Sequence, residues 1–272
     1  MTRLDELGEF GLLAELERRG LAVGIEHDAA RVDGLVVTQD ALVEDVHFRF
    51  DLLSWRDLGF RAAAVNISDL AASGAEPLAL IVSLGLPPET RVEDVLELYA
   101  GLNEPGVPVR GGDTTRSERV LLSVTALGRA EHVPGRAGAR PGDLVVVSGP
   151  LGAAGAAWRA GRLVRPPLRV EEGRRLARVA TAMLDLSDGL AADAGHLARR
   201  SGVRVALELD RVPLAPDATV DDLGFGEDYE LLATTPDALG FPVIGRVEEG
   251  EGVALTLDGR PAELPGWDHF RR

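Results

Sequence analysis

The stretch Ala64-Val65-Asn66-Ile67-Ser68-Asp69-Leu70-Ala71-Ala72 ends a longer segment, residues 55–72, whose pattern predicts a helix rich in small residues. Strand-like apolar runs lie on either side of it, at residues 35–38 and 78–86. Strand and helix patterns continue to alternate along the rest of the chain. This alternation predicts an α/β or α+β fold.

Outward from this helix, the hydrophobic pattern predicts elements in both halves of the chain. In the first half we expect helices at 7–16 and 92–102, strands at 107–109 and 120–127, and a turn at Gly111-Gly112-Asp113-Thr114-Thr115. In the second half we expect strands at 144–148, 183–185, 203–209, 229–234, 243–247 and 253–257, and helices after 149–155, at 171–182 and from Ser187.

A cluster of Pro, Gly and Arg at residues 134–141 separates the two halves. We therefore expect two domains, residues 1–134 and residues 135–272, with the second a mixed α/β domain. The Gly-rich run at 149–155 lacks the G-x-G-x-x-G spacing of a dinucleotide site, so a Rossmann-type dehydrogenase is a weak interpretation.

The composition excludes several kinds of chemistry. The 272 residues include no cysteine, so disulfides and cysteine-ligated metals are absent. All 29 basic residues are arginine, which excludes P-loop enzymes, protein kinases and Schiff-base enzymes because each needs a lysine. The net charge of -15 argues against a broad nucleic-acid surface. No apolar run is long enough to span a bilayer and no signal core is visible, so we expect a cytoplasmic protein.

Aspartates recur beside Gly, Ser or Thr at the ends of predicted strands or in tight turns. They are Asp28, Asp40, Asp69, Asp113, Asp185 and Asp188. Taken singly, each could be a turn former or a helix cap, and Asp188 suits the first turn of a helix that Ser187 or Asp188 would cap. Taken together they suggest a magnesium clamp on a triphosphate, because Mg²⁺ prefers oxygen ligands and neutralises phosphate charge.

The ordered motifs make the resemblance to a known family specific. They are Gly8-Glu9-Phe10, Thr38-Gln39-Asp40, residues 43–48, residues 64–72, residues 111–115, Asp185-Leu186-Ser187-Asp188-Gly189-Leu190, residues 226–231 and Gly266-Trp267-Asp268-His269-Phe270. In this order the chain resembles the thiamine-monophosphate kinases, which belong to the ATP-binding superfamily of aminoimidazole ribonucleotide synthetase. The resemblance implies a homodimer whose N-terminal domains pair their sheets, with ATP held where the two domains of a protomer meet.

The resemblance also implies roles for individual residues. It implies magnesium ligands at Asp28, Thr38, Asp40, Asp69, Asp113, Asp185 and Asp188. It implies nucleotide contacts at Gly111, Gly112, Arg136 and Ser187, and thiamine monophosphate contacts at His47, Glu227 and Trp267. The indole of Trp267 suits a cationic thiazolium ring, and Glu227 offers the opposite charge.

The implied reaction is in-line transfer of the γ-phosphate of ATP to thiamine monophosphate, with several Mg²⁺ ions. The acceptor phosphate is already anionic, so catalysis rests on metals and positioning, and we expect the largest losses from changes at Asp40, Asp69, Asp113, Asp185 and Asp188.

The chain departs from the family where Glu26-His27-Asp28 replaces the usual Gly-Asp-Asp and where Gln39 replaces a Thr. Two alternatives stay open. One is a sister enzyme of the same superfamily that uses ATP to activate another acceptor, and the other is a non-catalytic nucleotide or cation sensor.

Overall fold

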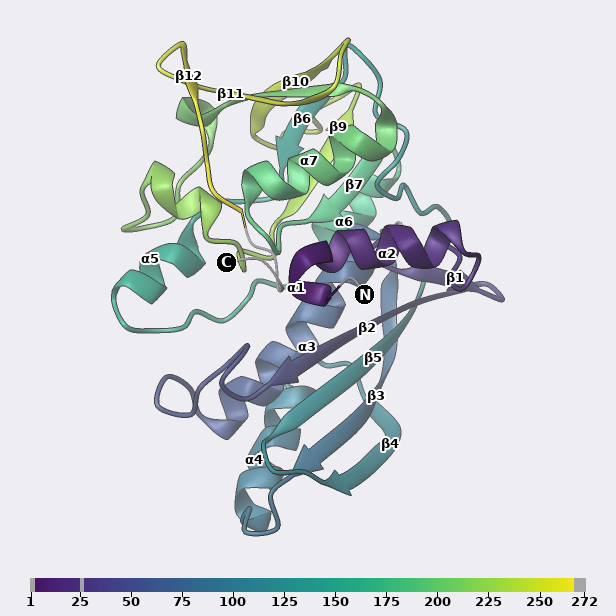
Figure 1. Ribbon diagram of the computed structural model, residues 1–272, viewed down its shortest axis with the longest axis vertical. Helices are drawn as coiled ribbons and strands as arrows, with labels where there is room; N and C mark the ends of the chain where they lie inside the picture. Colours follow the sequence, from purple (N-terminus) through teal and green to yellow (C-terminus); the bar gives the residue numbers. More distant parts are fainter. Residues whose placement is uncertain (1–2, 25–26, 267–272) are drawn as a thin grey trace.

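The computed structural model describes residues 3–24 and 27–266 and contains two β-sheets joined by one long helix. The sheets lie one above the other along the long axis of the molecule (Figure 1). Helix α3 (Trp55–Ala72) lies between them, in contact with strands of both sheets. The expected mixed α/β class with two sheets is confirmed.

The first sheet has five strands in the order β1-β2-β5-β3-β4. They are β1 (Ala30–Val32), β2 (Leu35–Val43), β3 (Glu76–Leu86), β4 (Val109–Arg116) and β5 (Leu121–Arg129). All neighbours are antiparallel except β3 and β4, which are parallel and are linked through α4 (Val92–Asn103). A parallel pair needs such a crossover because its two strands run in the same direction.

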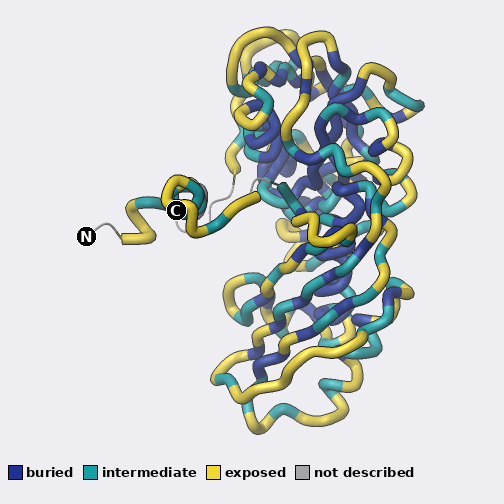
Figure 2. The backbone as a smooth tube through the Cα atoms, turned by 90° about the vertical axis from the view of Figure 1, so that its right-hand side faces the viewer, coloured by how far each residue is buried: buried dark blue, intermediate teal, exposed yellow. Residues whose placement is uncertain are grey.

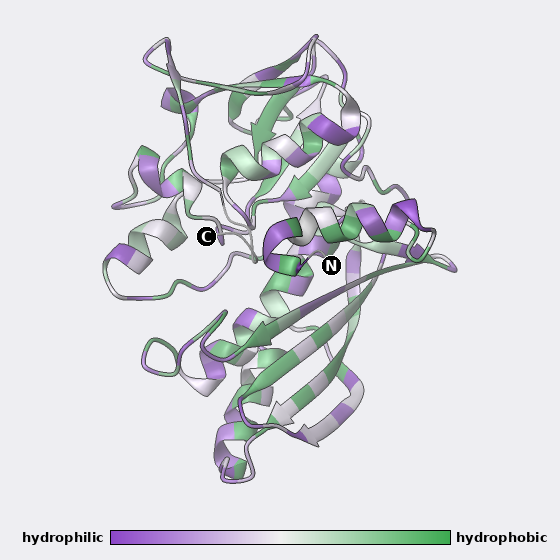
Figure 3. Ribbon diagram, viewed as in Figure 1, coloured by the Kyte–Doolittle hydropathy of each residue, from purple (hydrophilic) through white to green (hydrophobic). Residues whose placement is uncertain are grey.

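One face of this sheet packs against α3, as the alternation of burial along β5 shows. Leu122, Val124 and Ala126 are buried in the core beneath α3. The residues between them point to the opposite face and stay partly exposed. Figure 3 shows the long strands of this sheet as largely hydrophobic.

The second sheet has seven strands in the order β12-β11-β8-β10-β6-β9-β7. They are β6 (Leu144–Val147), β7 (Ala182–Asp185), β8 (Arg204–Glu208), β9 (Leu231–Thr235), β10 (Val243–Glu248), β11 (Gly252–Leu257) and β12 (Arg260–Ala262). Helix α7 (Leu190–Ser201) packs against β7, β8 and β11. The remaining elements are α5 (Ala153–Arg159), α6 (Val170–Ala177) and two 3-10 helices, η1 (Leu209–Arg211) and η2 (Val220–Gly224).

Helix α3 is buried on nearly all sides, because the first sheet, α4 and the second half of the chain surround it. Its last residues, Ala71 and Ala72, belong to a hydrophobic core that also contains Leu176, Met183 and Phe241 of the second half. A helix enclosed in this way needs small apolar residues on every face, which explains the composition of residues 55–72.

Two short helices, α1 (Leu4–Leu7) and α2 (Glu9–Arg18), precede the first sheet. Gly8 separates them, with a positive φ of 74° that interrupts the single helix expected at 7–16. Figure 2 shows this segment projecting away from the body of the molecule. Over residues 3–24 and 27–266, no helix is both long and apolar enough to span a membrane.

Three further local expectations from the sequence were wrong. Residues 111–115 are not a turn but part of β4, which pairs with β3 from Ile81 to Leu86. Helix α6 ends at Ala177 rather than at residue 182, because Ala182 begins a strand paired with β9. Tertiary pairing overrides local propensity in these two places.

The third error concerns the start of α7. This helix begins at Leu190, and its N-cap is Gly189, whose φ is 106°. Ser187 and Asp188 therefore lie in the turn before the helix. Neither caps the helix, and Asp188 is not in its first turn.

The contact between α3 and α4 is tight enough to test. A methyl group added at Gly59 would overlap the backbone carbonyl of Leu98, and one added at Gly101 would overlap that of Arg56. We expect Gly59→Ala to lower the free energy of unfolding by about 1–3 kcal/mol, since overpacking forces the helices apart. Thermal or urea unfolding measures this change.

Gly195→Ala in α7 is the matched control. A methyl group there would meet its nearest neighbour, Arg199 Nη1, at an ordinary distance of 3.5 Å. We expect no loss and a gain of up to about 1 kcal/mol from helix propensity. Equal destabilisation by both substitutions would show that close packing is not the cause.

Candidate functional site

Three carboxylates from separate elements meet between the two sheets. Asp28 precedes β1, Asp69 lies on α3, and Asp185 ends β7. Each offers an oxygen atom, and these three atoms all lie within 4.8 Å of one another. The meeting point exists because α3 brings Asp69 against the end of an edge strand of the second sheet.

Each of these carboxylates is held by a neighbouring donor. The hydroxyl of Thr38 donates to Asp69, and that of Ser68 donates to Asp185 at 2.6 Å. Arg136 forms an ion pair with Asp28, with its Nε 3.0 Å from Oδ1. Each of the three acids is thus held by a hydrogen bond or an ion pair within the chain.

Asp40 lies on β2 beside this group. Its backbone N–H donates to the Oδ1 atom of Asn66 at 3.2 Å, and the Asn66 amide donates to the carbonyl of Ala62 at 2.9 Å. Burial raises the pKa of Asp40, and the charge of Asp28 adds to the rise. Thr38 and Asp40, both expected as ligands, therefore adjoin the three-carboxylate group.

The acids destabilise one another's charged forms. Burial raises the pKa of Asp69 well above its usual range, and the charges of Asp185, Asp40 and Asp28 reinforce the effect. Burial also raises the pKa of Asp185 to about 7, with a further contribution from the charge of Asp28. A divalent cation would relieve this repulsion, and the all-oxygen donor set fits Mg²⁺.

A second group contains Asp188, Asp193 and His196, whose candidate ligand atoms also lie within 4.8 Å of one another. The carboxylate of Asp193 accepts a hydrogen bond of 3.0 Å from the backbone N–H of Asp188. Burial lowers the pKa of His196 to about 4, and the nearby Arg136 charge contributes. The imidazole is therefore neutral at physiological pH.

Asp113, Gly111 and Gly112 lie apart from these groups within one chain. They are exposed on the edge strand β4. In the sheet register, Asp40 pairs with Val124, Val124 with Val82, and Val82 with Gly112. Three strand spacings, about 14 Å, therefore separate Gly112 from Asp40. Asp113 pairs with Ser83 and points to the face opposite α3.

Of the residues expected at the acceptor site, Glu227 forms an ion pair with the buried Arg61 of α3. His47 lies in the turn after β2, where its Nδ1 atom accepts from the backbone N–H of Val43 at 3.1 Å. Ser187 is half-buried, and its carbonyl accepts from the backbone N–H of Glu227 at 2.8 Å. Trp267 lies outside the described residues.

The segment that carries Glu227 has an unusual backbone. Glu227 and Tyr229 both have positive φ values, 59° and 52°. Between them, Asp228 accepts from the backbone N–H groups of Gly152 and Ala154 at the start of α5. Left-handed conformations in non-glycine residues cluster at functional sites. Residues 226–230 are therefore shaped to present Glu227 at the junction of the sheets.

Three buried polar residues of α3 were not predicted as site residues from the sequence: Arg61, Asn66 and Ser68. Their signal was their position. Arg61 precedes Ser68 by seven residues and Asp69 by eight, and both spacings place residues on the same side of a helix. A charged residue within a helix of small apolar residues is otherwise hard to explain.

Asp69→Asn tests the repulsion among the carboxylates. In metal-free buffer we expect this variant to unfold with a free energy about 1–2 kcal/mol higher than the original chain, because one charge leaves a crowded site. Added Mg²⁺ should stabilise the original chain more than the variant. Calorimetric melting with and without Mg²⁺ measures both effects.

Asp222→Asn is the control for an acid with a good partner. Asp222 accepts hydrogen bonds from Arg159 at 2.8 and 2.7 Å, and the pKa of Asp222 falls to about 2 because of Arg159. This substitution should destabilise the chain without altering its response to Mg²⁺. A loss of stability in Asp69→Asn as well would count against repulsion as the dominant effect.

Comparison with known proteins gives consistent matches. The family model "AIR synthase related protein, N-terminal domain" matches residues 26–130. Thiamine-monophosphate kinase of Aquifex aeolicus is 36% identical over 312 residues, covering 98% of this chain and 100% of that protein. Thiamine-monophosphate kinase of Escherichia coli is 35% identical, covering 97% of this chain and 98% of the other.

Solved structures agree. One described as "AaThiL complexed with AMPPCP and TMP" has a TM-score of 0.92 at 35% identity and covers 99% of both chains. The hydrogenase maturation protein HypE in complex with ATP has a TM-score of 0.71 at 20% identity, which shows a shared fold alone. Relatives this similar over nearly the full chain establish that the chain belongs to the thiamine-monophosphate kinase family.

Proposed function

We propose that this protein transfers the γ-phosphate of ATP to thiamine monophosphate and so forms thiamine diphosphate and ADP. The observation that carries the proposal is the group of Asp28, Asp69 and Asp185 where the two halves of the chain meet. Support also comes from relatives named thiamine-monophosphate kinase and from the solved complex of one with AMPPCP, an ATP analogue, and TMP.

Asp28, Asp69 and Asp185 would hold Mg²⁺, with Thr38 and Asp40 beside them. When bound, the metal ions neutralise phosphate charge and polarise the γ-phosphoryl group. Asp188 would serve as a further ligand from the turn before α7. The hydroxyls of Thr38 and Ser68 keep the carboxylates of Asp69 and Asp185 oriented toward the shared centre.

The transfer needs little proton chemistry from the chain. An oxygen of the acceptor phosphate attacks the γ-phosphorus, and the bond to the oxygen that bridges the β- and γ-phosphorus atoms breaks, leaving ADP. The attacking oxygen is already anionic near neutral pH, so no general base is required. The chain must instead hold two anions together in line, which is a matter of charge and positioning.

The substrates would approach from different elements. We assign the nucleotide to Gly111, Gly112, Arg136 and Ser187, and the acceptor to His47, Glu227 and Trp267. Arg136 is suitably placed, because it already contacts Asp28. Both substrates would be cytoplasmic metabolites, in line with the cytoplasmic location expected from the sequence.

We also propose a homodimer built on the outer face of the first sheet. Val37, Leu127 and Ala79 form one row across that face, and Ile81 lies in the next row. All four are partly exposed. A second copy would bury this apolar face and cover the edge strand β4. Asp113, which points to the same face, would then lie within the assembly.

The direct test combines purified protein with ATP, Mg²⁺ and thiamine monophosphate and follows thiamine diphosphate as fluorescent thiochrome. We expect product only when all three components are present. Binding of ATP and Mg²⁺ without product would favour a sensor. ATP turnover that depends on another acceptor would favour a sister enzyme of the superfamily.

Asp113→Asn tests whether Asp113, which lies apart from the other predicted metal ligands within one chain, takes part in the metal clamp. We expect turnover at saturating Mg²⁺ to fall by about 100-fold, the size of effect that loss of one transition-state contact has in other enzymes. Asp94→Asn on the outside of α4 is the control and should leave turnover unchanged. Near-normal turnover of Asp113→Asn would refute its assignment to the metal clamp.

The dimer is tested by Ile81→Glu in sedimentation velocity. A charge on the outer face of the sheet should convert the dimer to a monomer, because burying it without a partner is costly. Leu96→Glu is the control, since Leu96 is 64% exposed on α4. A dimer that survives Ile81→Glu, or one that Leu96→Glu disrupts, would place the interface elsewhere.

A further inference from the structure

Arg61 is an arginine enclosed by the fold rather than exposed on its surface. Only 4% of the residue is exposed to solvent. Its Nη2 atom forms an ion pair with Oε1 of Glu227, but among the described residues its Nε–H group has no hydrogen-bond partner. A buried guanidinium with an unused donor is costly unless a ligand completes its contacts.

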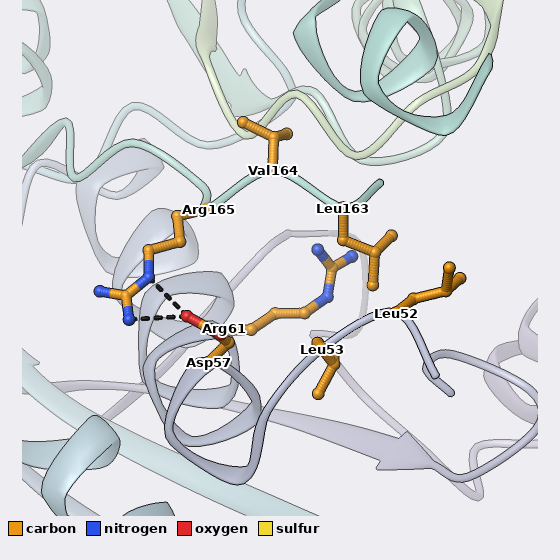
Figure 4. Close-up of a pocket in the computed structure, with 7 residues that line it drawn as sticks. All are labelled: Leu52, Leu53, Asp57, Arg61, Leu163, Val164 and Arg165. Atoms are coloured by element: carbon orange, nitrogen blue, oxygen red, sulfur yellow. Dashed lines mark hydrogen bonds and ion pairs between the residues drawn. The ribbon is translucent and has the colours of Figure 1, made fainter. Parts of the chain in front are cut away.

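This arginine lines a cavity of about 120 Å³ between the two halves of the chain (Figure 4). The wall from the first half contains Leu52, Leu53, Asp57 and Arg61. The wall from the second half contains residues 163–165. Figure 4 shows the guanidinium group of Arg61 between the side chains of Leu163 and Leu53.

The other charged groups of this cavity are already paired. Arg165 contacts the carboxylate of Asp57 at 2.7 and 2.9 Å and that of Glu104 at 2.5 Å. Figure 4 shows the guanidinium of Arg165 directed toward Asp57. Arg61 is therefore the cationic group in the described cavity wall that retains an unused donor.

The position of Arg61 relates it to the candidate site. It precedes Asp69 by eight residues on α3, so both lie on one face of the helix, about 12 Å apart along its axis. Its guanidinium carbon lies 5.9 Å from the centre of the Tyr229 ring.

The partner of Arg61 indicates the chemistry of the ligand. Under the proposed function, Glu227 meets the cationic ring of the acceptor, which draws it away from Arg61. The same acceptor carries an anionic phosphate group. A molecule with both charges can therefore replace one ion pair by two, and the guanidinium fork matches phosphate geometry.

We propose that Arg61 binds the phosphate group of the acceptor, exchanging Glu227 for that phosphate when the acceptor's cationic ring pairs with Glu227. The inference rests on the proposed function and adds a specificity-determining residue to it. Arg61 thereby distinguishes a phosphorylated acceptor from its dephosphorylated form. In a chain without lysine, an arginine must supply this positive charge.

The test is calorimetric titration of Arg61→Gln with thiamine monophosphate and, separately, with thiamine, which lacks the phosphate. We expect affinity for thiamine monophosphate to fall about 10- to 100-fold, as for loss of a charge-assisted contact, and affinity for thiamine to change less than about 3-fold. In the thiochrome assay, KM for thiamine monophosphate should rise while KM for ATP stays constant.

Three further variants sharpen the result. Arg61→Lys keeps the charge and should recover part of the preference for the phosphorylated ligand. Glu227→Gln should weaken both ligands to a similar degree, because both carry the ring. Arg56→Gln, which removes a half-exposed arginine from the same helix, should leave both affinities unchanged.

A purely structural role for the Arg61 and Glu227 pair predicts a different pattern. Arg61→Gln would then lower the melting temperature and weaken both ligands equally, or change neither affinity. Either result overturns the inference about Arg61 alone, provided that the original chain converts thiamine monophosphate. Failure of the original chain to bind or convert it would overturn the proposed function and this inference with it.

Discussion

The enclosure of α3 is the constraint on which the rest of the structure depends. From Leu58 onward this helix is covered by a sheet, by another helix and by the second half of the chain, so little of its surface meets water. A polar side chain buried on this part of the helix needs a hydrogen-bond partner, either in the protein or in a ligand. Asn66 bonds to the carbonyl of Ala62 and to the amide of Asp40, and Ser68 bonds to Asp185. These partners join the two sheets at the place where the carboxylates gather.

Much of the fold could be predicted from the sequence because hydrophobic periodicity reports which residues are buried. All six strands expected in the second half are present, with small shifts of their ends. The turn predicted at residues 111–115 was wrong because glycine and aspartate favour turns locally, whereas pairing with β3 makes these residues a strand. The predicted start of α7 was wrong because a glycine with positive φ, rather than a polar side chain, precedes the helix.

The candidate site was predicted in part for a similar reason. Aspartates beside small residues stand out in a sequence, so Asp28, Asp69 and Asp185 could be named, and the fold brings them together. Their supports could not be found in this way. The spacing of Arg61 and Ser68 on one helix face is a weak signal that does not identify their partners, which lie more than 100 positions away in the sequence. The placement of Asp113 depends on the edge of a sheet, which local patterns do not specify.

Several acids inside this protein are neutralised by arginine. Arg169 holds Glu230 with hydrogen bonds of 2.7 and 2.5 Å, Arg136 holds Asp28, and Arg61 holds Glu227. Around Asp69 and Asp185 this balance fails, and acids outnumber arginines. Such a cluster of carboxylates lowers the stability of the folded chain but attracts cations. This is a common compromise between stability and function.

The hydrophobic core at the end of α3 has a consequence for how the chain can be divided. Ala71 and Ala72 pack with Leu176, Met183 and Phe241, and a methyl group on Gly173 of α6 would overlap the carbonyl of Ala71. A fragment that stops near residue 134 would expose Ala71 and Ala72 to water, because it lacks the residues of the second half that cover them. We therefore expect each half of the chain to be less stable alone than in the intact protein, because separation exposes apolar side chains on both sides of this contact.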